Sequence, residues 1–177
     1  VLTGSTGFYG TPRGRVDEST PAGAGPRAES AARAESAFRE TVPHGTVLRL
    51  GGLYRRGRGP LQPLLRRGAP PDGPPDAALP LIHRDDAVAA ILAALVHPRP
   101  ASIYLAVTPP APRRDTFYRE ACRRHGLAEP LFGEPLAPDP APARRREEAA
   151  ATCDVGRLRR DLLPDPAHPD WRDAVEG

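Results

Sequence analysis

The sequence contains no lysine, so its 25 basic residues are all arginine. This absence excludes catalysis through a lysine Schiff base, a phosphate-binding loop built on lysine, and an acid/base pair of tyrosine and lysine four residues apart. Methionine is also absent, even at position 1. A complete translation product normally begins with methionine, and we therefore expect these 177 residues to be part of a longer one.

Cysteines and long apolar runs are also scarce. Cys122 and Cys153 are the two cysteines and form no Cys-x-x-Cys motif, so we expect free thiols, no metal site and a cytoplasmic protein. The longest apolar run, Ala87 to Val96, is too short to cross a membrane. We therefore expect no membrane association.

The charge pattern argues against a nucleic-acid partner. The net charge is +3, and the arginines are scattered among 22 acidic residues. An Arg-rich nucleic-acid binder is an alternative interpretation, but neither a basic stacking platform nor a recognition helix stands out. We expect a small-molecule substrate instead.

The periodicity of the apolar residues predicts an α/β fold with a parallel sheet in a single domain. The abundant proline and glycine, 24 and 17 residues, predict long loops, including residues 11–26, residues 69–80 and a proline-rich connector at residues 130–142. Strands are predicted at Val1–Ser5, Thr46–Leu50 and Ser102–Val107, the first two neighbouring and parallel, and helices at Arg27–Glu40, Leu61–Arg67, Asp85–Val96, Asp115–His125 and Asp154–Leu163.

The segment Gly4 to Gly10 has two interpretations. Three glycines spaced by three after a strand match the fingerprint of a dinucleotide site. That fingerprint requires a helix directly after the third glycine, whereas Pro12 and Gly14 interrupt the chain here. The alternative interpretation uses the longer segment from Val1 to Pro21.

That longer segment resembles the extended short-chain dehydrogenase/reductase family, in its NAD-dependent epimerase/dehydratase group. A strand ends in Ser-x-x-x-Tyr-Gly at Ser5 to Gly10, and the resemblance continues through most of the chain. The further matching segments are Leu48–Tyr54, the Tyr-Arg-Arg-Gly-Arg sequence at Tyr54–Arg58, the His-x-x-Asp sequence at His83–Asp86, Ile103–Leu105 and Thr152–Leu158.

The resemblance implies a partial Rossmann-like, doubly wound parallel sheet with C-terminal substrate-side elements. It implies NAD or NADP as cofactor, and a sugar nucleotide or similar small molecule as substrate of an oxidoreductase or epimerase/dehydratase. The site residues it implies are Ser5 and Tyr9 for catalysis, Gly51, Gly52 and Leu53 for the cofactor, and Arg49, Arg58 and His83 for the substrate.

Several of these residues have an equally simple structural interpretation. Tyr9 beside a glycine is typical of a packed loop, and His83 and Asp86 at a helix start are typical of scaffold residues. Arg49 emerges from a strand and either pairs with a buried carboxylate or reaches a substrate phosphate. Both alternatives for Arg49 stay open at this point.

Two departures from the family pattern bear on activity. The stretch that corresponds to the family's Tyr-x-x-x-Lys pair lies near Ala28 to Ser36 and contains neither residue. The family's N-terminal nucleotide-binding half is also missing from these residues. We therefore expect the C-terminal portion of such a protein, inactive on its own and prone to associate into homo-oligomers. A non-catalytic Rossmann-like binding module is the alternative.

Overall fold

A computed structural model describes residues 1–68, 70, 73–130, 132 and 151–176. The predicted connector at residues 130–142 lies almost entirely outside the described residues. The strands are β1 (Leu2–Ser5), β2 (Arg15–Val16), β3 (Val47–Leu50), β4 (Gly52–Tyr54), β5 (Leu81–His83), β6 (Ile103–Ala106) and β7 (Thr152–Cys153). The helices are α1 (Pro26–Thr41), α2 (Leu61–Arg67), α3 (Arg84–Val96), α4 (Arg114–His125) and α5 (Gly156–Asp161), with 3-10 turns η1 (Thr6–Tyr9) and η3 (Trp171–Val175).

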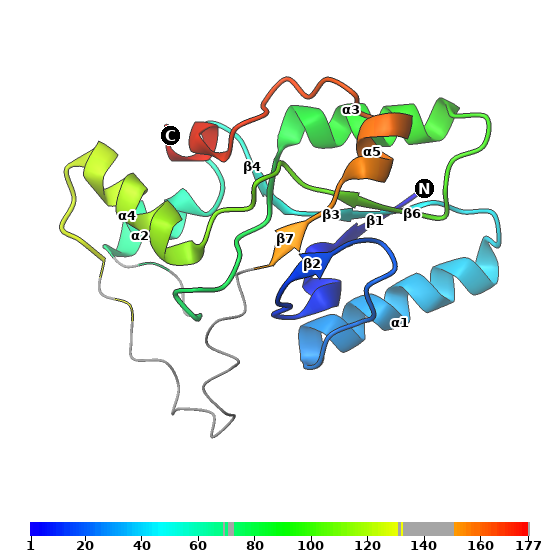
Figure 1. Cartoon of the computed structure of the whole chain (residues 1–177), viewed down its shortest axis with the longest axis horizontal. Coiled ribbons are helices and arrows are strands. Elements are labelled where there is room, and N and C mark those ends of the chain that lie inside the picture. Colours follow the sequence, from blue (N-terminus) through cyan, green and yellow to red (C-terminus); the bar gives the residue numbers. More distant parts are fainter. Residues whose placement is uncertain (69, 71–72, 131, 133–150, 177) are drawn as a thin grey trace.

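A parallel sheet in the order β1-β3-β6 forms the centre of the molecule (Figure 1). Leu2 pairs with Val47, which pairs on its other side with Ile103. All four residues of β3 are buried, as expected for the middle strand of a sheet covered on both faces. The predicted strands, and the parallel pairing of the first two, are therefore confirmed.

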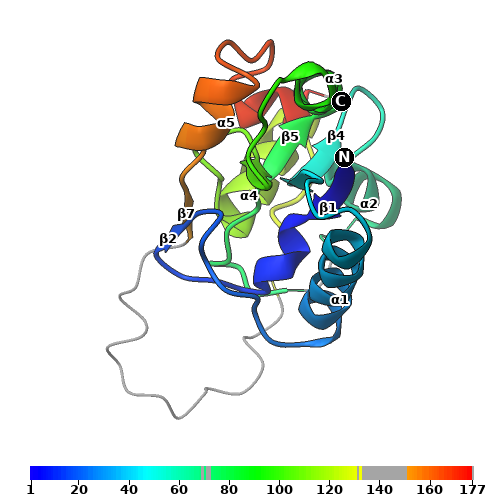
Figure 2. The same cartoon turned by 90° about the vertical axis from the view of Figure 1, so that its right-hand side faces the viewer.

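Helices cover both faces of this sheet. Helix α1 lies on one face, and α3 and α5 lie on the other (Figures 1 and 2). This arrangement confirms the α/β fold class. Among the described residues, no helix is both long and apolar enough to cross a membrane.

Two short parallel pairs, β4–β5 and β2–β7, were not predicted from the sequence. The chain leaves the central sheet at Gly51, whose N–H still donates to the carbonyl of Ala106, while Gly52 N–H donates to the carbonyl of Pro80. The segment after β3, expected to be a loop, therefore continues as β4 beside β5. Likewise, the loop expected at residues 11–26 contains β2, which pairs with β7 near the C-terminus.

Helix α3 packs small residues against the sheet. Its buried positions include Ala87, Ala90 and Ala94, which allow the helix to approach the strands closely. The large apolar residues of its pattern lie mostly on the outer side. These exposed residues are Val88, Leu92, Leu95 and Val96.

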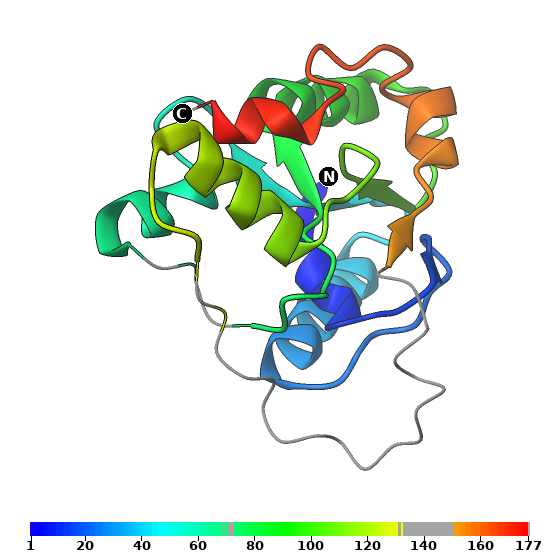
Figure 3. The same ribbon diagram turned by 60° about the vertical axis from the view of Figure 1, so that its left-hand side comes forward.

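A second apolar cluster lies beside the central sheet, where α2, α4 and η3 meet (Figure 3). Phe117 and Tyr118 of α4 are fully buried there, and the Trp171 ring lies 5.8 Å from the Phe117 ring. This packing brings the C-terminal residues back against β5 and the start of α3.

Candidate functional site

Ser5 ends β1 at the carboxyl edge of the parallel sheet, the edge at which α/β proteins bind ligands. Its Oγ accepts a hydrogen bond of 3.0 Å from the Gly7 N–H and so caps η1. The Ser5 hydroxyl proton is not used by this bond and is available to a ligand, because the side chain is exposed.

The turn after Ser5 does not match a dinucleotide fingerprint. Only one 3-10 turn follows the strand, and Gly10 ends it with a φ of 64°. The next regular element, β2, begins at Arg15. The described segment therefore lacks the long helix start that holds a pyrophosphate.

Tyr9 is buried and belongs to a hydrogen-bonded group inside the protein. Its hydroxyl accepts a bond of 2.9 Å from Arg49 Nη1. Burial raises the pKa of Tyr9, and the opposing effect of Arg49 is smaller. A phenol with a raised pKa is a poor base at neutral pH, so this geometry favours the structural interpretation of Tyr9.

Arg49 has the buried carboxylate partner that was one of its two interpretations. Its Nη2 and Nε donate to Glu35 of α1 at 2.8 and 3.0 Å, and the side chains are 3% and 5% exposed. The guanidinium also lies over the Phe8 ring, 3.5 Å from the centroid. Its charge is thus compensated within the protein, and its expected contact with substrate stays a prediction without support from this geometry.

Gly51 and Gly52 allow a close approach of the protein's own backbone. A Cβ on Gly51 would lie 3.0 Å from both the Pro80 carbonyl oxygen and the Leu81 carbonyl carbon. The space that a Cβ of Gly51 would enter is therefore filled by the strand before α3, although a cofactor contact was expected at Gly51. Leu53 is half exposed on β4. The cofactor roles of these three residues stay predictions.

Arg58 and His83 lie on separate elements after β3. The backbone groups of Arg55 and Arg58 bond to each other at 3.0 and 2.9 Å, and this turn exposes the Arg58 side chain. His83 ends β5 and caps α3, its Nδ1 accepting from the Asp85 N–H at 3.2 Å. Burial, and in addition the nearby His168, lower the pKa of His83. Of the two, Arg58 is the one exposed to solvent.

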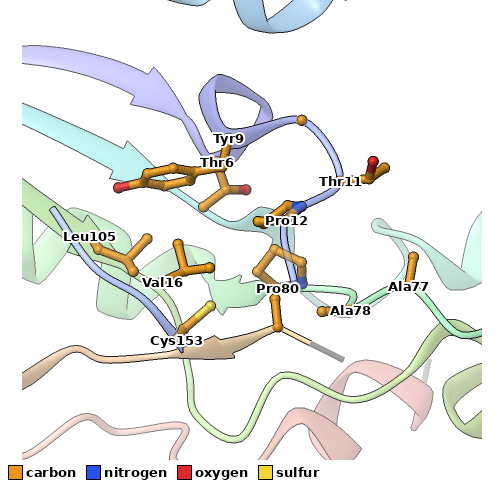
Figure 4. A pocket seen from close by; sticks show the side chains of 12 residues that line it. Thr6, Tyr9, Thr11, Pro12, Val16, Ala77, Ala78, Pro80, Leu105 and Cys153 are labelled. Atoms are coloured by element: carbon orange, nitrogen blue, oxygen red, sulfur yellow. The ribbon is translucent and has the colours of Figure 1, made fainter. Parts of the chain in front are cut away.

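A small cavity lies beside η1, between the central sheet and the β2–β7 pair (Figure 4). Its volume is about 60 Å³, and Thr6, Tyr9, Val16, Leu105 and Cys153 are among the lining residues. This volume holds a few water molecules rather than a sugar nucleotide. A wider groove of about 350 Å³ lies along α1 above the Arg49–Glu35 pair.

Both cysteines are free thiols, as predicted. Cys153 lines the small cavity, and burial raises its pKa to about 11. Burial also raises the pKa of Cys122. Neither thiol has the lowered pKa of a reactive cysteine.

Comparison with known proteins places this geometry in a fold. No protein-family model matches the chain. Protein YeeZ of Escherichia coli K12 is 32% identical over 138 residues, covering 77% of this chain and 49% of YeeZ. The solved structure of MoeE5 with UDP-glucose and NAD is 22% identical with a TM-score of 0.74, covering 98% of this chain and 61% of MoeE5. The structure of a putative NAD-dependent epimerase/dehydratase from Methylobacillus flagellatus is 23% identical with a TM-score of 0.71, covering 98% of this chain and 60% of its own. The chain has the epimerase/dehydratase fold.

A further structure with this epimerase/dehydratase fold is the human epimerase family protein SDR39U1 with NADPH, which is 18% identical with a TM-score of 0.73. It is matched over 99% of this chain and 63% of its own length. The chain thus spans about half the length of YeeZ and less than two thirds of the length of the MoeE5 and SDR39U1 chains.

Two residues that organise this fold, Glu35 and His168, were not expected from the sequence, whereas Asp86 was expected as a scaffold residue at a helix start. Glu35 forms an ion pair with Arg49. The feature of the sequence that could have indicated this pair is a glutamate on the inner side of the predicted helix Arg27–Glu40. Asp86 is buried and accepts from the backbone N–H groups of Ala167 and His168 at 2.8 and 3.1 Å. His168 stacks on His83 with ring centroids 3.5 Å apart, and no sequence motif announced it.

Proposed function

We propose that this chain is the substrate-binding part of an NAD(P)-dependent oxidoreductase or epimerase/dehydratase that acts on a sugar nucleotide or a similar small molecule. The observation that carries the proposal is the position of Ser5, exposed at the carboxyl edge of the parallel sheet with a hydroxyl proton to donate. The fold similarity supports it, because the MoeE5 structures hold UDP-glucose or UDP-glucuronic acid together with NAD.

Arg58 is the residue we propose for the diphosphate of such a substrate. The turn at Arg55–Arg58 exposes its guanidinium, and a guanidinium binds phosphate oxygens in a bidentate manner. Ser5 would donate to a hydroxyl or carbonyl oxygen of the sugar. His83 is a weaker candidate for a substrate contact, because its ring is largely covered by Tyr54 and His168.

NAD or NADP is the proposed cofactor of the complete protein, by analogy with relatives solved with NAD or NADPH. The described residues do not by themselves fit a dinucleotide. The turn after β1 offers no long helix start for the pyrophosphate, and the space beside Gly51 is filled by backbone. We therefore propose that residues other than the turn after β1 hold the pyrophosphate, while the cofactor contact of Gly51, Gly52 and Leu53 stays a prediction.

The fate of the proton distinguishes the two functional hypotheses. The stretch Ala28–Ser36 on α1 contains no tyrosine or lysine, and Tyr9 has a raised pKa. Loss of a positioned acid or base costs about 10²–10⁴-fold in rate. The alternative, a non-catalytic binding module, would keep sugar-nucleotide binding without any turnover.

We further infer a cytoplasmic protein that associates with itself. The free thiols suit a reducing compartment, and the exposed outer residues of α3 suit self-association.

Calorimetric titration with UDP-glucose tests the proposal. We expect Arg58→Gln to weaken binding at least about tenfold, since a charge-assisted hydrogen bond contributes about 1.5–3 kcal/mol. Ser5→Ala should weaken it by a smaller factor. The matched control is Arg67→Gln, which removes the same charge from the exposed side of α2 and should leave the affinity unchanged.

Two results would contradict the proposal. One is the absence of UDP-glucose binding at millimolar concentration. The other is an equal loss in Arg58→Gln and Arg67→Gln, which would show a general charge effect. Reduction of NAD by the chain in the presence of UDP-glucose would instead contradict the expectation that the chain alone is inactive, because oxidation of a sugar hydroxyl transfers its hydride to NAD.

A further inference from the structure

Two histidines and a carboxylate from distant parts of the chain meet where β5 passes into α3. Ligand atoms of His83, Asp85 and His168 all lie within 4.8 Å of one another. The two imidazole rings are stacked, with centroids 3.5 Å apart and planes inclined by 32°. Figure 3 shows the C-terminal segment returning over the end of β5 to make this meeting possible. The sequence motif at His83 explains only one of the two histidines.

The position of His168 is fixed from two sides. The buried Asp86 carboxylate accepts from the His168 backbone N–H at 3.1 Å and from the Ala167 N–H at 2.8 Å. The His168 Nδ1 lies 3.1 Å from the Asp173 carboxylate. In metal sites, a carboxylate commonly binds one ring nitrogen of a histidine and directs the other toward the ion. The Asp173 contact leaves Nε2 of His168 as its free ligand atom.

The donor atoms of this cluster suit a cation. Arg84 contacts Oδ1 of Asp85, whereas Oδ2 lies 3.8 Å from His83 Nδ1. The cluster therefore presents imidazole nitrogens and one carboxylate oxygen, a donor set typical of zinc.

We propose that His83, Asp85 and His168 bind one divalent transition-metal ion of the zinc type, with the remaining tetrahedral position taken by water. Zinc lies about 2.0–2.2 Å from nitrogen and oxygen ligands, so the ligand atoms must move closer together on binding. The two imidazole rings must also turn out of their stack, because each ring binds a metal ion in its own plane. Asp85 can make this movement because its side chain is 53% exposed. A bond through His83 Nδ1 replaces the 3.2 Å hydrogen bond from the Asp85 N–H.

The bound ion would join the C-terminal segment to the start of α3. His83 belongs to β5 and Asp85 to the first turn of α3, whereas His168 lies three positions before the start of η3. Because the ion binds the folded chain, it should raise the midpoint of thermal unfolding in proportion to its affinity and concentration. This role shares only His83 with the proposed sugar-nucleotide function and does not rest on that function.

The test is a titration of the metal-stripped chain with zinc chloride in competition with a chromophoric chelator. We expect one equivalent bound with micromolar or tighter affinity. His168→Gln and Asp85→Asn should each weaken binding at least tenfold, and Asp173→Asn about 10–100-fold because it acts through His168. The matched control is His44→Gln, which removes an exposed histidine outside the cluster and should bind as the parent does.

Cobalt as a spectroscopic probe adds a second measurement that does not depend on His168→Gln being folded. We expect the visible bands of tetrahedral cobalt with nitrogen and oxygen ligands, lost in the exposed variant Asp85→Asn. The proposal is overturned by failure to bind zinc at 100 μM, by unchanged affinity in Asp85→Asn, or by loss of binding in His44→Gln. An intense thiolate-to-cobalt band would overturn it as well, because it would assign the ion to a cysteine.

Discussion

The buried pair of Arg49 and Glu35 allows a quantitative test of the fold. Glu35→Gln keeps the shape of the side chain and removes its charge, which leaves the guanidinium of Arg49 buried without a counter-charge. Removal of one partner from a buried ion pair costs about 3–5 kcal/mol. The 3% exposure of Arg49 places this pair at the buried extreme. For a chain of this length, about 2–4 °C per kcal/mol gives a fall of about 6–20 °C in the unfolding midpoint.

Urea denaturation followed by circular dichroism measures the free energy, and calorimetry measures the midpoint. The matched control is Glu120→Gln, because Glu120 pairs with Arg123 and Arg124 at the surface of α4 and, with a side chain 21% exposed, remains in contact with solvent. This variant should leave both values nearly unchanged. A loss below about 0.5 kcal/mol in Glu35→Gln would refute the reasoning, because surface substitutions already vary by that amount.

Three further predictions follow from other parts of the structure. Gly51→Ala should destabilise the chain by about 1–3 kcal/mol in urea unfolding, because its Cβ would lie 3.0 Å from backbone atoms of the strand before α3. In Gly52→Ala the new Cβ would first meet the flexible Leu81 side chain, so the loss of unfolding free energy should be smaller. Equal losses in the two variants would contradict this reasoning. Burial raises the pKa of Cys153 to about 11, so its thiol should react slowly with a thiol reagent at pH 8 in the native chain and rapidly after denaturation. A fast reaction of the native chain would show an exposed thiolate and would contradict this prediction. The hydrogen bond from Arg113 lowers the pKa of Asp115, so the folded state binds this proton less tightly than the unfolded state. The resulting stabilisation is present above the unfolded pKa near 4 and is lost as pH falls through the folded pKa. In urea unfolding between pH 3 and 6, the free energy of unfolding of Asp115→Asn should therefore fall less steeply toward acid pH than that of the parent chain. An unchanged acid limb in that variant would contradict this prediction.

The sequence predicted the elements whose signals are local. The strands β1, β3 and β6 are short apolar or β-branched runs followed by small residues, and the structure has them within two residues of the expected bounds. Helix α2 begins and ends where predicted, and α4 ends at Gly126, which adopts a φ of 62°. Such signals depend only on residues next to one another in the chain.

The elements that the sequence did not predict depend on contacts between distant segments. The strand β4 exists because Gly52 meets the carbonyl of Pro80, 28 positions later. The strand β2 has only two residues and is defined by its pairing with β7, more than 130 positions away. The apolar pattern of α3 predicted a helix correctly but not its orientation, because alanines rather than leucines face the sheet.

The candidate site shows the same division. The position of Ser5 at the end of a strand follows from the local motif, and the structure has it there. The partner of Arg49 stayed open, because only folding brings Glu35 of α1 within 2.8 Å of it. The contact of His168 with His83 depends on the path of the C-terminal segment, which no local pattern specifies.

The most direct test of the central claim, that these residues form a substrate-side part without a dinucleotide site, is a titration of the chain with NADH followed by fluorescence. We expect no micromolar affinity, because only a single 3-10 turn follows β1 and the chain then bends at Gly10. Gly7→Val should therefore leave the weak signal unchanged. Micromolar affinity that is abolished by Gly7→Val would contradict the account and would make the segment from Gly4 to Gly10 a nucleotide-binding loop.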